Sequence, residues 1–190
     1  MTDTPLRLAI VIGSTREGRL GPTVGAWFAA QARQRDDMTI DVIDAADVDP
    51  PSSIGAPTSK TFDRATEVLA AADAYTIVTC EYNHSYPGTL KNLIDHHFHE
   101  WRAKPVGFVS YGGYTGGKLA VEHLRGVFAE LHTATMRDMV SFHGPWNGFG
   151  PDGLPVDPDG AGAAAKVLLD QLAWWGHALR DARAVRPYGA

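Results

Sequence analysis

Three stretches of this chain carry residue types that bind small molecules. The first, at residues 13–23, reads GSTREGRLGPT and combines glycines and hydroxyl groups with Arg16 and Arg19. Backbone amides in such a turn attract a phosphate, and a guanidinium adds a planar set of charged donors. In a chain with a formal net charge of −5, two arginines in one loop indicate a local site for an anion. The alternative interpretation is an ordinary connector whose arginines are solvated.

The other two stretches combine aromatic side chains with groups that form hydrogen bonds. Residues 81–95 read EYNHSYPGTLKNLID, in which Tyr82 and Asn83 offer a flat aromatic surface and an amide suited to a planar ring. The alternative is an Asx-type turn, with Asn83 or Ser85 capping the next helix. Residues 110–118 read SYGGYTGGK, and their glycine pairs let the backbone approach a ligand closely. The alternative there is a flexible entry to a helix.

Two common phosphate-binding motifs do not fit the first stretch. A P-loop requires lysine and then a hydroxyl residue where this chain has Arg19 and Leu20. A dinucleotide fingerprint requires a second glycine where the chain has Thr15. A phosphate monoester, held by hydroxyl groups, amides and arginine, is therefore the better interpretation.

The elements that position these stretches alternate along the chain. Apolar runs predict strands at 6–13, 38–45, 74–80, 104–111 and 133–142, and helical periodicity predicts helices at 23–35, 60–72, 88–98, 118–132 and 163–182. Such alternation predicts an α/β fold with a parallel sheet covered by helices on both faces. The three stretches then follow strands at the carboxyl edge of the sheet, where α/β proteins bind ligands. We expect one domain over residues 1–190, because no linker or repeat interrupts the pattern.

Composition limits the possible partners. The net charge of −5 argues against a broad surface for nucleic acid or anionic membranes. A single cysteine, Cys80, excludes an intramolecular disulfide, and neither a signal peptide nor a run of about 20 apolar residues is visible. We therefore expect a cytoplasmic protein without a membrane segment.

Two other features suggest chemistry only weakly. The run HHFHE at 96–100 lacks a second ligand cluster, so we expect no metal and assign the histidines to a helix end. No G-x-S-x-G motif marks a nucleophile, and we name no catalytic side chain. The loop at 143–160, which contains GPWNGFG, either covers a ligand or packs its own aromatic side chains.

Taken together, the three stretches resemble the NADPH-dependent FMN reductase family. The resemblance runs from about residue 6 to residue 142, and its most specific part is the Glu-Tyr-Asn-x-Ser followed by Pro-x-x-Leu-Lys-Asn. The family usually has proline where this chain has Cys80. The resemblance implies a flavodoxin-like three-layer sandwich with a five-stranded parallel sheet, FMN as cofactor and NADPH as co-substrate.

The resemblance also implies which residues hold FMN. The phosphate would lie at Ser14, Arg16 and the loop around Gly21 and Thr23, and Arg19 is a further candidate whose side chain could instead face solvent. The isoalloxazine ring would be bordered by two groups of residues: Glu81, Tyr82 and Asn83 on one side, and Ser110, Tyr111, Gly112 and Gly113 on the other.

The implied activity is a ping-pong transfer of hydride from NADPH to FMN and on to a small-molecule acceptor. That acceptor could be a flavin, a quinone, an azo compound or a metal oxyanion. Two alternatives from other classes stay open. One is a flavodoxin-like electron carrier without NAD(P)H turnover, and the other is a nucleotide-binding regulatory module.

The resemblance further implies a homodimer or tetramer. The sequence places Leu90, Leu93, Ile94 and His97 on one face of the helix at 88–98, and Phe98 and Trp101 extend its apolar area. We expect this face to contact a second subunit near the flavin, because apolar patches mark contact surfaces. The competing interpretation is that Phe98 and Trp101 fold back into the core of their own subunit.

Overall fold

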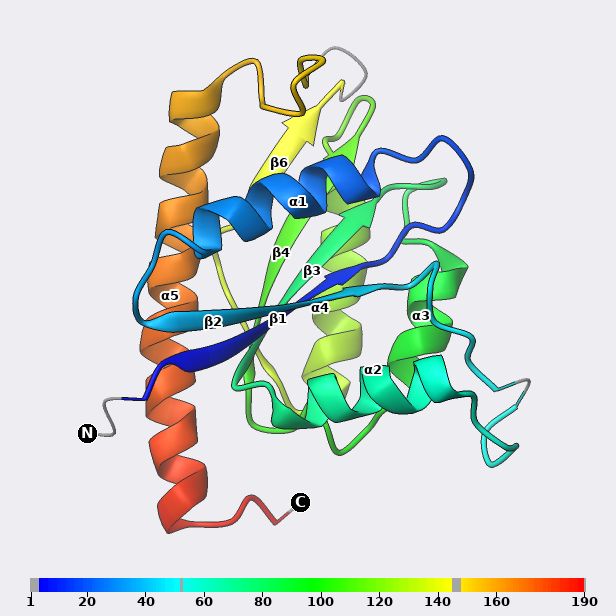
Figure 1. Cartoon of the computed structure of the whole chain (residues 1–190), viewed down its shortest axis with the longest axis vertical. Helices are drawn as coiled ribbons and strands as arrows, with labels where there is room; N and C mark the ends of the chain where they lie inside the picture. The colour runs from blue at the N-terminus through cyan, green and yellow to red at the C-terminus, as the bar shows by residue number, and fades with distance from the viewer. Residues whose placement is uncertain (1–3, 52, 145–147, 190) are drawn as a thin grey trace.

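The computed structural model describes residues 4–51, 53–144 and 148–189, which form a central sheet flanked by helices (Figure 1). The strands are β1 (Leu6–Ile12), β2 (Met38–Asp44), β3 (Ala74–Cys80), β4 (Pro105–Gly112), β5 (Ala134–Thr135) and β6 (Val140–His143). The helices are α1 (Gly21–Ala32), α2 (Lys60–Ala71), α3 (Gly88–Asp95), α4 (Lys118–Glu130) and α5 (Pro158–Val185). The strand order is β2-β1-β3-β4-β5, with β6 also paired to β4, and every described pairing is parallel. This is the flavodoxin-like order, so the expected fold class is confirmed.

The position of each strand in the sheet follows from its side chains. β3 and β4 are buried along their whole length, which suits near-continuous apolar runs between two helical layers. β2 mixes buried and exposed residues and lies at the edge of the sheet, as its alternating sequence predicts.

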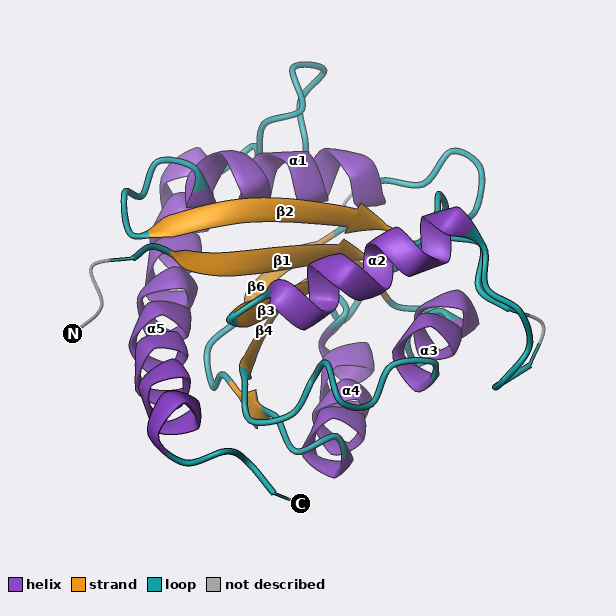
Figure 2. Ribbon diagram, turned by 60° about the horizontal axis from the view of Figure 1, so that its bottom comes forward, coloured by secondary structure: helices purple, strands orange, loops and turns teal. Residues whose placement is uncertain are grey.

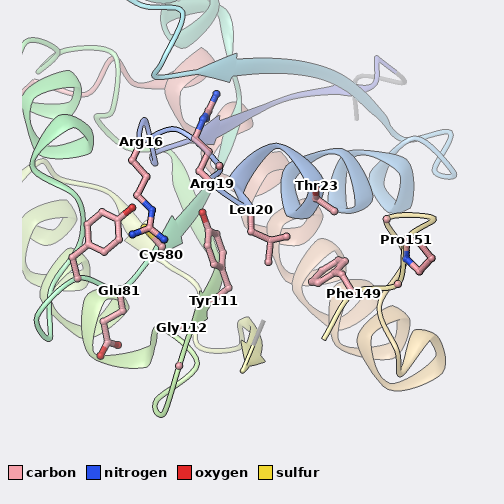
Figure 3. Close-up of a pocket in the computed structure, with 15 residues that line it drawn as sticks. Arg16, Arg19, Leu20, Thr23, Cys80, Glu81, Tyr111, Gly112, Phe149 and Pro151 are labelled. Carbon is pink, nitrogen blue, oxygen red and sulfur yellow. The ribbon is translucent and has the colours of Figure 1, made fainter. Parts of the chain in front are cut away.

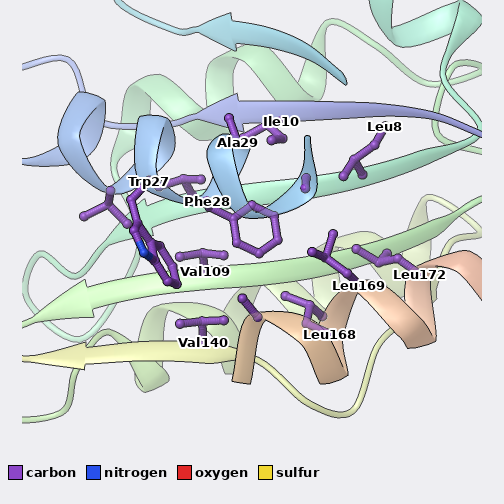
Figure 4. Close-up of a cluster of buried hydrophobic side chains, with 14 of the residues drawn as sticks. Leu8, Ile10, Trp27, Phe28, Ala29, Val109, Val140, Leu168, Leu169 and Leu172 are labelled. Carbon is purple, nitrogen blue, oxygen red and sulfur yellow. The ribbon is translucent and has the colours of Figure 1, made fainter. Parts of the chain in front are cut away.

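Each face of the sheet is covered by its own set of helices (Figure 2). On one face, Phe28 of α1 and Leu168 and Leu172 of α5 pack over β1, β3 and β4 (Figure 4). On the other face, α2, α3 and α4 cover the same strands, with Leu69, Leu93 and Phe128 among the buried side chains. The carboxyl ends of β1, β3 and β4 therefore meet at one edge of a rigid three-layer core.

The fifth strand differs from the expectation of one element over 133–142. The structure divides it into β5 and β6, which both lie beside β4, so the sheet has six strands rather than five. The break has a local cause. The Arg125 guanidinium donates to the carbonyl oxygens of Met136 and Arg137, at 2.6 and 3.0 Å, and the Asp138 carboxylate bonds with the Gln171 side chain.

Two helix boundaries also differ from the sequence predictions. α5 begins at Pro158 rather than 163, because the Asp157 carboxylate accepts a hydrogen bond from the Gly160 amide at 2.9 Å and caps the helix. α3 ends at Asp95, three residues before the predicted end. Among the described residues, no helix combines the length and apolar character needed to cross a membrane.

The expectation that the apolar face of α3 contacts a second subunit was wrong, because this face is covered within its own chain. Leu90, Leu93 and Ile94 are buried in the core of their own chain, and Trp101 is 0% exposed. The Trp101 ring packs against those of Tyr75 and Phe128, with centroids 4.7 and 5.4 Å apart. The competing interpretation therefore holds for Trp101, whereas Phe98 stays 42% exposed. Trp101 is buried because the segment that joins α3 to β4 runs back toward the sheet.

His97 is buried as well, and its ring is occupied by neighbours within the chain. Its Nδ1 lies 2.8 Å from the carbonyl oxygen of Leu93, and its Nε2 lies 2.8 Å from the Thr66 hydroxyl. Burial lowers the pKa of His97, which keeps the ring neutral near pH 7. In the part of the chain that the structure describes, no group of three or more His, Cys, Asp or Glu side chains could hold a metal ion.

Candidate functional site

A cavity of about 410 Å³ lies at the carboxyl edge of the sheet, within the size range of small-molecule sites (Figure 3). Its walls come from the loop after β1, the end of β3, the end of β4 and a hairpin before α5. The residues lining it are Arg16, Gly18, Arg19, Leu20, Thr23, Cys80, Glu81, Tyr82, Tyr111, Gly112, Gly113, Phe149, Gly150, Pro151 and Gly153. All three stretches singled out in the sequence thus contribute to one cavity.

Arg16 and Arg19 line the same cavity but are held differently. The Arg16 guanidinium lies 5.6 Å from the centre of the Tyr82 ring, and Figure 3 shows it pointing into the cavity beside Cys80. Within the described residues, no carboxylate lies within ion-pair distance of Arg16. The Arg19 guanidinium instead points away from the cavity (Figure 3), where it donates to both carboxylate oxygens of Asp44 at 2.7 and 2.8 Å. Arg16 is therefore the cation that can meet a ligand.

The amino end of α1 adds to the positive character of this wall. The residue at its N-cap, Leu20, offers no side-chain hydrogen bond, and the first turn contains no acidic residue. The first-turn amides and the positive end of the helix dipole therefore border the cavity beside Thr23, without a carboxylate of the helix to offset them. Arg16 and the start of α1 together form an anion-attracting end.

Ser14 and Gly21 do not line the cavity, although the sequence placed them at the ligand. Ser14 is 1% exposed, and its Oγ accepts a hydrogen bond from the Tyr111 hydroxyl at 2.9 Å. Gly21 lies against both hydroxyl groups, because a Cβ at this position would clash with Ser14 Oγ and lie close to the Tyr111 hydroxyl. Ser14 and Gly21 therefore support the loop on the side that faces away from the cavity.

A tight turn follows β3 and explains why the strand ends in polar residues. The backbone amides and carbonyls of Tyr82 and Ser85 bond to each other, and both central residues have positive φ, 49° for Asn83 and 66° for His84. Asparagine tolerates this conformation better than most residues. The turn leaves Asn83 exposed and outside the cavity wall. Neither Asn83 nor Ser85 caps α3, which starts after Pro87 with no side-chain cap.

The end of β4 is braced by the side chains of Glu81 and Ser110. The Glu81 carboxylate accepts hydrogen bonds from the Thr115 hydroxyl and the Leu119 amide at 2.6 and 3.2 Å. The hydroxyl of Ser110 is buried and donates to the Gly116 carbonyl at 2.7 Å, so Ser110 does not line the cavity. These bonds hold the glycine-rich turn against the start of α4, while Gly112 and Gly113 face the cavity.

The aromatic part of the wall stays uncharged near neutral pH. Burial raises the pKa of Tyr82 to about 12 and raises that of Tyr111 further above its ordinary value. Burial also raises the pKa of the Cys80 thiol, so this cysteine is protonated and a poor nucleophile. The cavity therefore combines one cationic end with a neutral aromatic surface.

The hairpin at 148–156 forms a wall of the cavity, a role that the sequence left open. An isolated bridge between Phe149 and Pro155 joins its two arms, and the Phe149 ring packs on Phe142 with centroids 4.8 Å apart. The residues PWN of the same loop lie outside the described residues. The sequence indicates a wall here only through an aromatic, glycine-rich loop after the last strand, and it leaves open whether the loop covers a ligand. Phe149 both packs on the core and lines the cavity, so the two interpretations hold together.

The fold and the cavity define a class: a flavodoxin-like protein whose cavity suits a ligand with an anionic group and a planar ring. A model described as NADPH-dependent FMN reductase matches residues 6–147. The chain therefore belongs to the NADPH-dependent FMN reductase family. It is an FMN-dependent NAD(P)H oxidoreductase, with FMN as cofactor and NADPH as electron donor.

Proteins of similar sequence support the assignment of this chain to the family. An NAD(P)H-dependent FMN reductase of Schizosaccharomyces pombe is 33% identical over 139 residues, which cover 67% of this chain and 69% of that protein. A 2-hydroxy-1,4-benzoquinone reductase of a Burkholderia species is 32% identical over 69% of this chain and 74% of its own length. Among solved structures, the flavoenzyme NAD(P)H:acceptor oxidoreductase FerB of Paracoccus denitrificans has a TM-score of 0.72, with 22% identity, and covers 90% of this chain and 97% of that one. The structural likeness supports the flavodoxin-like fold.

Proposed function

We propose that FMN lies in the cavity at the carboxyl ends of β1, β3 and β4. Its phosphate would meet Arg16, the amino end of α1 and Thr23, and its ring would lie along Tyr82 and Tyr111. The observation that carries this proposal is that an arginine without an ion-pair partner among the described residues and an uncapped helix start border the same cavity as two neutral tyrosines. FMN has a matching shape, with a phosphate at one end and a planar ring at the other.

The residues named from the sequence that do not line the cavity would act without touching the ligand. Ser14, Gly21 and Ser110 support the two loops from behind, and Gly112 and Gly113 leave room for a ring to approach the backbone. We assign no contact to Asn83, whose side chain is exposed. When bound, FMN supplies hydride acceptance from NADPH and hydride delivery to the second substrate. The chain binds and orients it, and excludes water with the aromatic wall.

For the second substrate, a quinone or a similarly flat, uncharged ring fits the cavity best. Leu20, Phe149 and Pro151 give the far wall an apolar surface, which favours such a molecule over a metal oxyanion. Relatives of this chain are named for quinone and azo substrates, among them the benzoquinone reductase and an FMN-dependent NADPH-azoreductase of Staphylococcus haemolyticus.

The first test is the spectrum and the kinetics of the purified protein. We expect a yellow protein that releases FMN on denaturation and oxidises NADPH with 1,4-benzoquinone, with parallel double-reciprocal plots, because both substrates use the same cavity in turn. Intersecting plots, or turnover by the flavin-free protein, would contradict this mechanism.

The same measurements distinguish the alternative functions. Slow bleaching of the flavin by NADPH would favour an electron carrier, and a colourless protein retaining ATP or GTP would favour a regulatory module. Faster turnover with chromate than with benzoquinone would contradict the proposed acceptor.

We also propose that residues 1–190 act as one FMN-binding domain. α5 (Pro158–Val185) lies entirely outside the matched residues 6–147, yet Leu168 and Leu172 pack into the same core as β1 and α1. The cytoplasmic location expected from the sequence stays a prediction.

The homodimer stays a proposal, with a new location for the contact. Three of the exposed large apolar side chains of α5 lie within about two helical turns of one another: Val167 at 46%, Trp174 at 66% and Trp175 at 41%. The two tryptophan rings pack edge to face, with centroids 5.1 Å apart, which gives a continuous apolar patch. A symmetric contact between two copies of α5 would cover it, and closed two-fold pairs are the commonest assemblies.

A charge at this patch should separate the subunits. In light scattering at micromolar concentration, we expect the mass of a dimer or tetramer for the unmodified protein and a smaller mass for Trp174→Glu. Ile54→Glu, at a position that is 81% exposed and lies between β2 and α2, away from α5, should leave the mass unchanged. A monomeric unmodified protein, or an unchanged mass for Trp174→Glu, would exclude this contact.

A further inference from the structure

We propose that Arg19 and Asp44 are positioning residues for the phosphate of FMN, which fix the loop between β1 and α1 instead of contributing charge to the ligand. This inference rests on the function proposed above. It changes the role expected for Arg19 from the sequence, where its guanidinium was a candidate phosphate ligand.

The Arg19–Asp44 pair is mostly buried and joined by two hydrogen bonds. Both side chains are 16% exposed, and the guanidinium donates from two nitrogens to the two carboxylate oxygens at 2.7 and 2.8 Å. Its Nη1 also donates to the carbonyl oxygen of Ser14 at 2.6 Å. The hydrogen bonds with Asp44 raise the pKa of Arg19 above its ordinary value. A guanidinium held by this two-pronged contact ties β2 to the first residues of the loop.

Two further contacts hold the same part of the loop from other elements. The Tyr111 hydroxyl, at the end of β4, donates to Ser14 Oγ at 2.9 Å. The Thr89 hydroxyl, in the first turn of α3, donates to the Gly13 carbonyl at 3.2 Å. Residues 13 and 14 are therefore held from three neighbouring elements before any ligand binds. A loop ordered in advance loses less conformational entropy on binding, so these contacts favour affinity without touching the ligand.

The charge of Asp44 makes the two possible roles of Arg19 distinguishable. A carboxylate close to an anion site repels the ligand and competes for the arginine. If Arg19 acts as a phosphate ligand, removing the Asp44 charge should free it and strengthen FMN binding. If Arg19 acts through the position of the loop, the same substitution should weaken FMN binding. The sign of the effect therefore decides between them.

The experiment titrates flavin-free protein with FMN and, separately, with riboflavin, which lacks the phosphate, and follows flavin fluorescence. For Asp44→Asn, we expect FMN affinity to fall by up to about 10- to 100-fold, the range for losing a charged hydrogen-bonding partner. Riboflavin affinity should change by less than about twofold, since the loop would meet only the phosphate. Asp41→Asn is the matched control, because Asp41 also lies on β2 and pairs with an arginine, Arg7, at 3.0 Å, but Arg7 does not line the cavity whereas Arg19 does.

A second variant keeps the test decisive if Asp44→Asn does not fold. Arg19→Lys retains the positive charge but loses the two-pronged contact, so it should weaken FMN binding in the same selective way. Unchanged or tighter FMN binding by both variants, or an equal loss for FMN and riboflavin, would overturn the inference. If the unmodified protein itself binds FMN no better than riboflavin, the proposed phosphate site fails first and the inference fails with it.

Discussion

Trp101→Ala is expected to lower the free energy of unfolding by about 3–5 kcal/mol, the range for removing a large aromatic side chain from a core. Trp101 is 0% exposed, its ring contacts those of Tyr75 and Phe128, and its indole nitrogen donates to the Ile94 carbonyl at 3.3 Å. The substitution would leave a cavity between α3, α4 and the sheet, because these elements cannot close around an alanine. Urea denaturation followed by circular dichroism measures the loss.

Tyr114→Ala is the control for this measurement. Removing a large aromatic side chain at a position that is 98% exposed and outside α5 should alter the free energy of unfolding by no more than about 0.5 kcal/mol. If Trp101→Ala left the stability unchanged and instead reduced the mass of the assembly, Trp101 would be a subunit contact after all. That outcome would contradict the packing described here.

Arg16→Ala is expected to weaken FMN binding by about 10- to 100-fold, from the typical contribution of a hydrogen bond to a charged group. Arg16 is an exposed arginine that points into the cavity, and no ion pair among the described residues holds it elsewhere. A phosphate at the start of α1 would therefore lose a cation that has no ion-pair partner among the described residues. Riboflavin should bind the variant and the unmodified protein alike, because it lacks the phosphate that Arg16 would contact.

The control for Arg16→Ala is Arg33→Ala, which removes an exposed arginine at the far end of α1. It lowers the net charge by the same amount, so it corrects for the general attraction of the protein for an anion. Equal FMN affinity for a folded Arg16→Ala and the unmodified protein would rule out Arg16 as the phosphate anchor. Equal losses for both arginine variants would assign the effect to overall charge.

The fold was largely predictable because its signals are local. Uninterrupted apolar runs such as AYTIVTC at 74–80 can be buried only as strands inside a sheet, and the amphipathic runs between them require helices over its faces. Since parallel strands place all their carboxyl ends on one edge, three loops distant in the sequence could be expected to share a site. Arg16, Tyr82, Tyr111 and Gly112 do line one cavity.

Only the tertiary structure decided what each side chain of that site does. Arg16 and Arg19 are three residues apart in one loop and equivalent in sequence, yet only Arg19 meets a carboxylate, because the sheet places the end of β2 beside β1. The bond between Ser14 and Tyr111 spans 97 positions and turns a candidate ligand into a support for the loop. Trp101 is apolar whether it covers a subunit or fills a core, and its place depends on the path of the chain after α3. Residue types and spacing determine which groups reach the edge of the sheet, whereas long-range partners determine which of them stay available to a ligand.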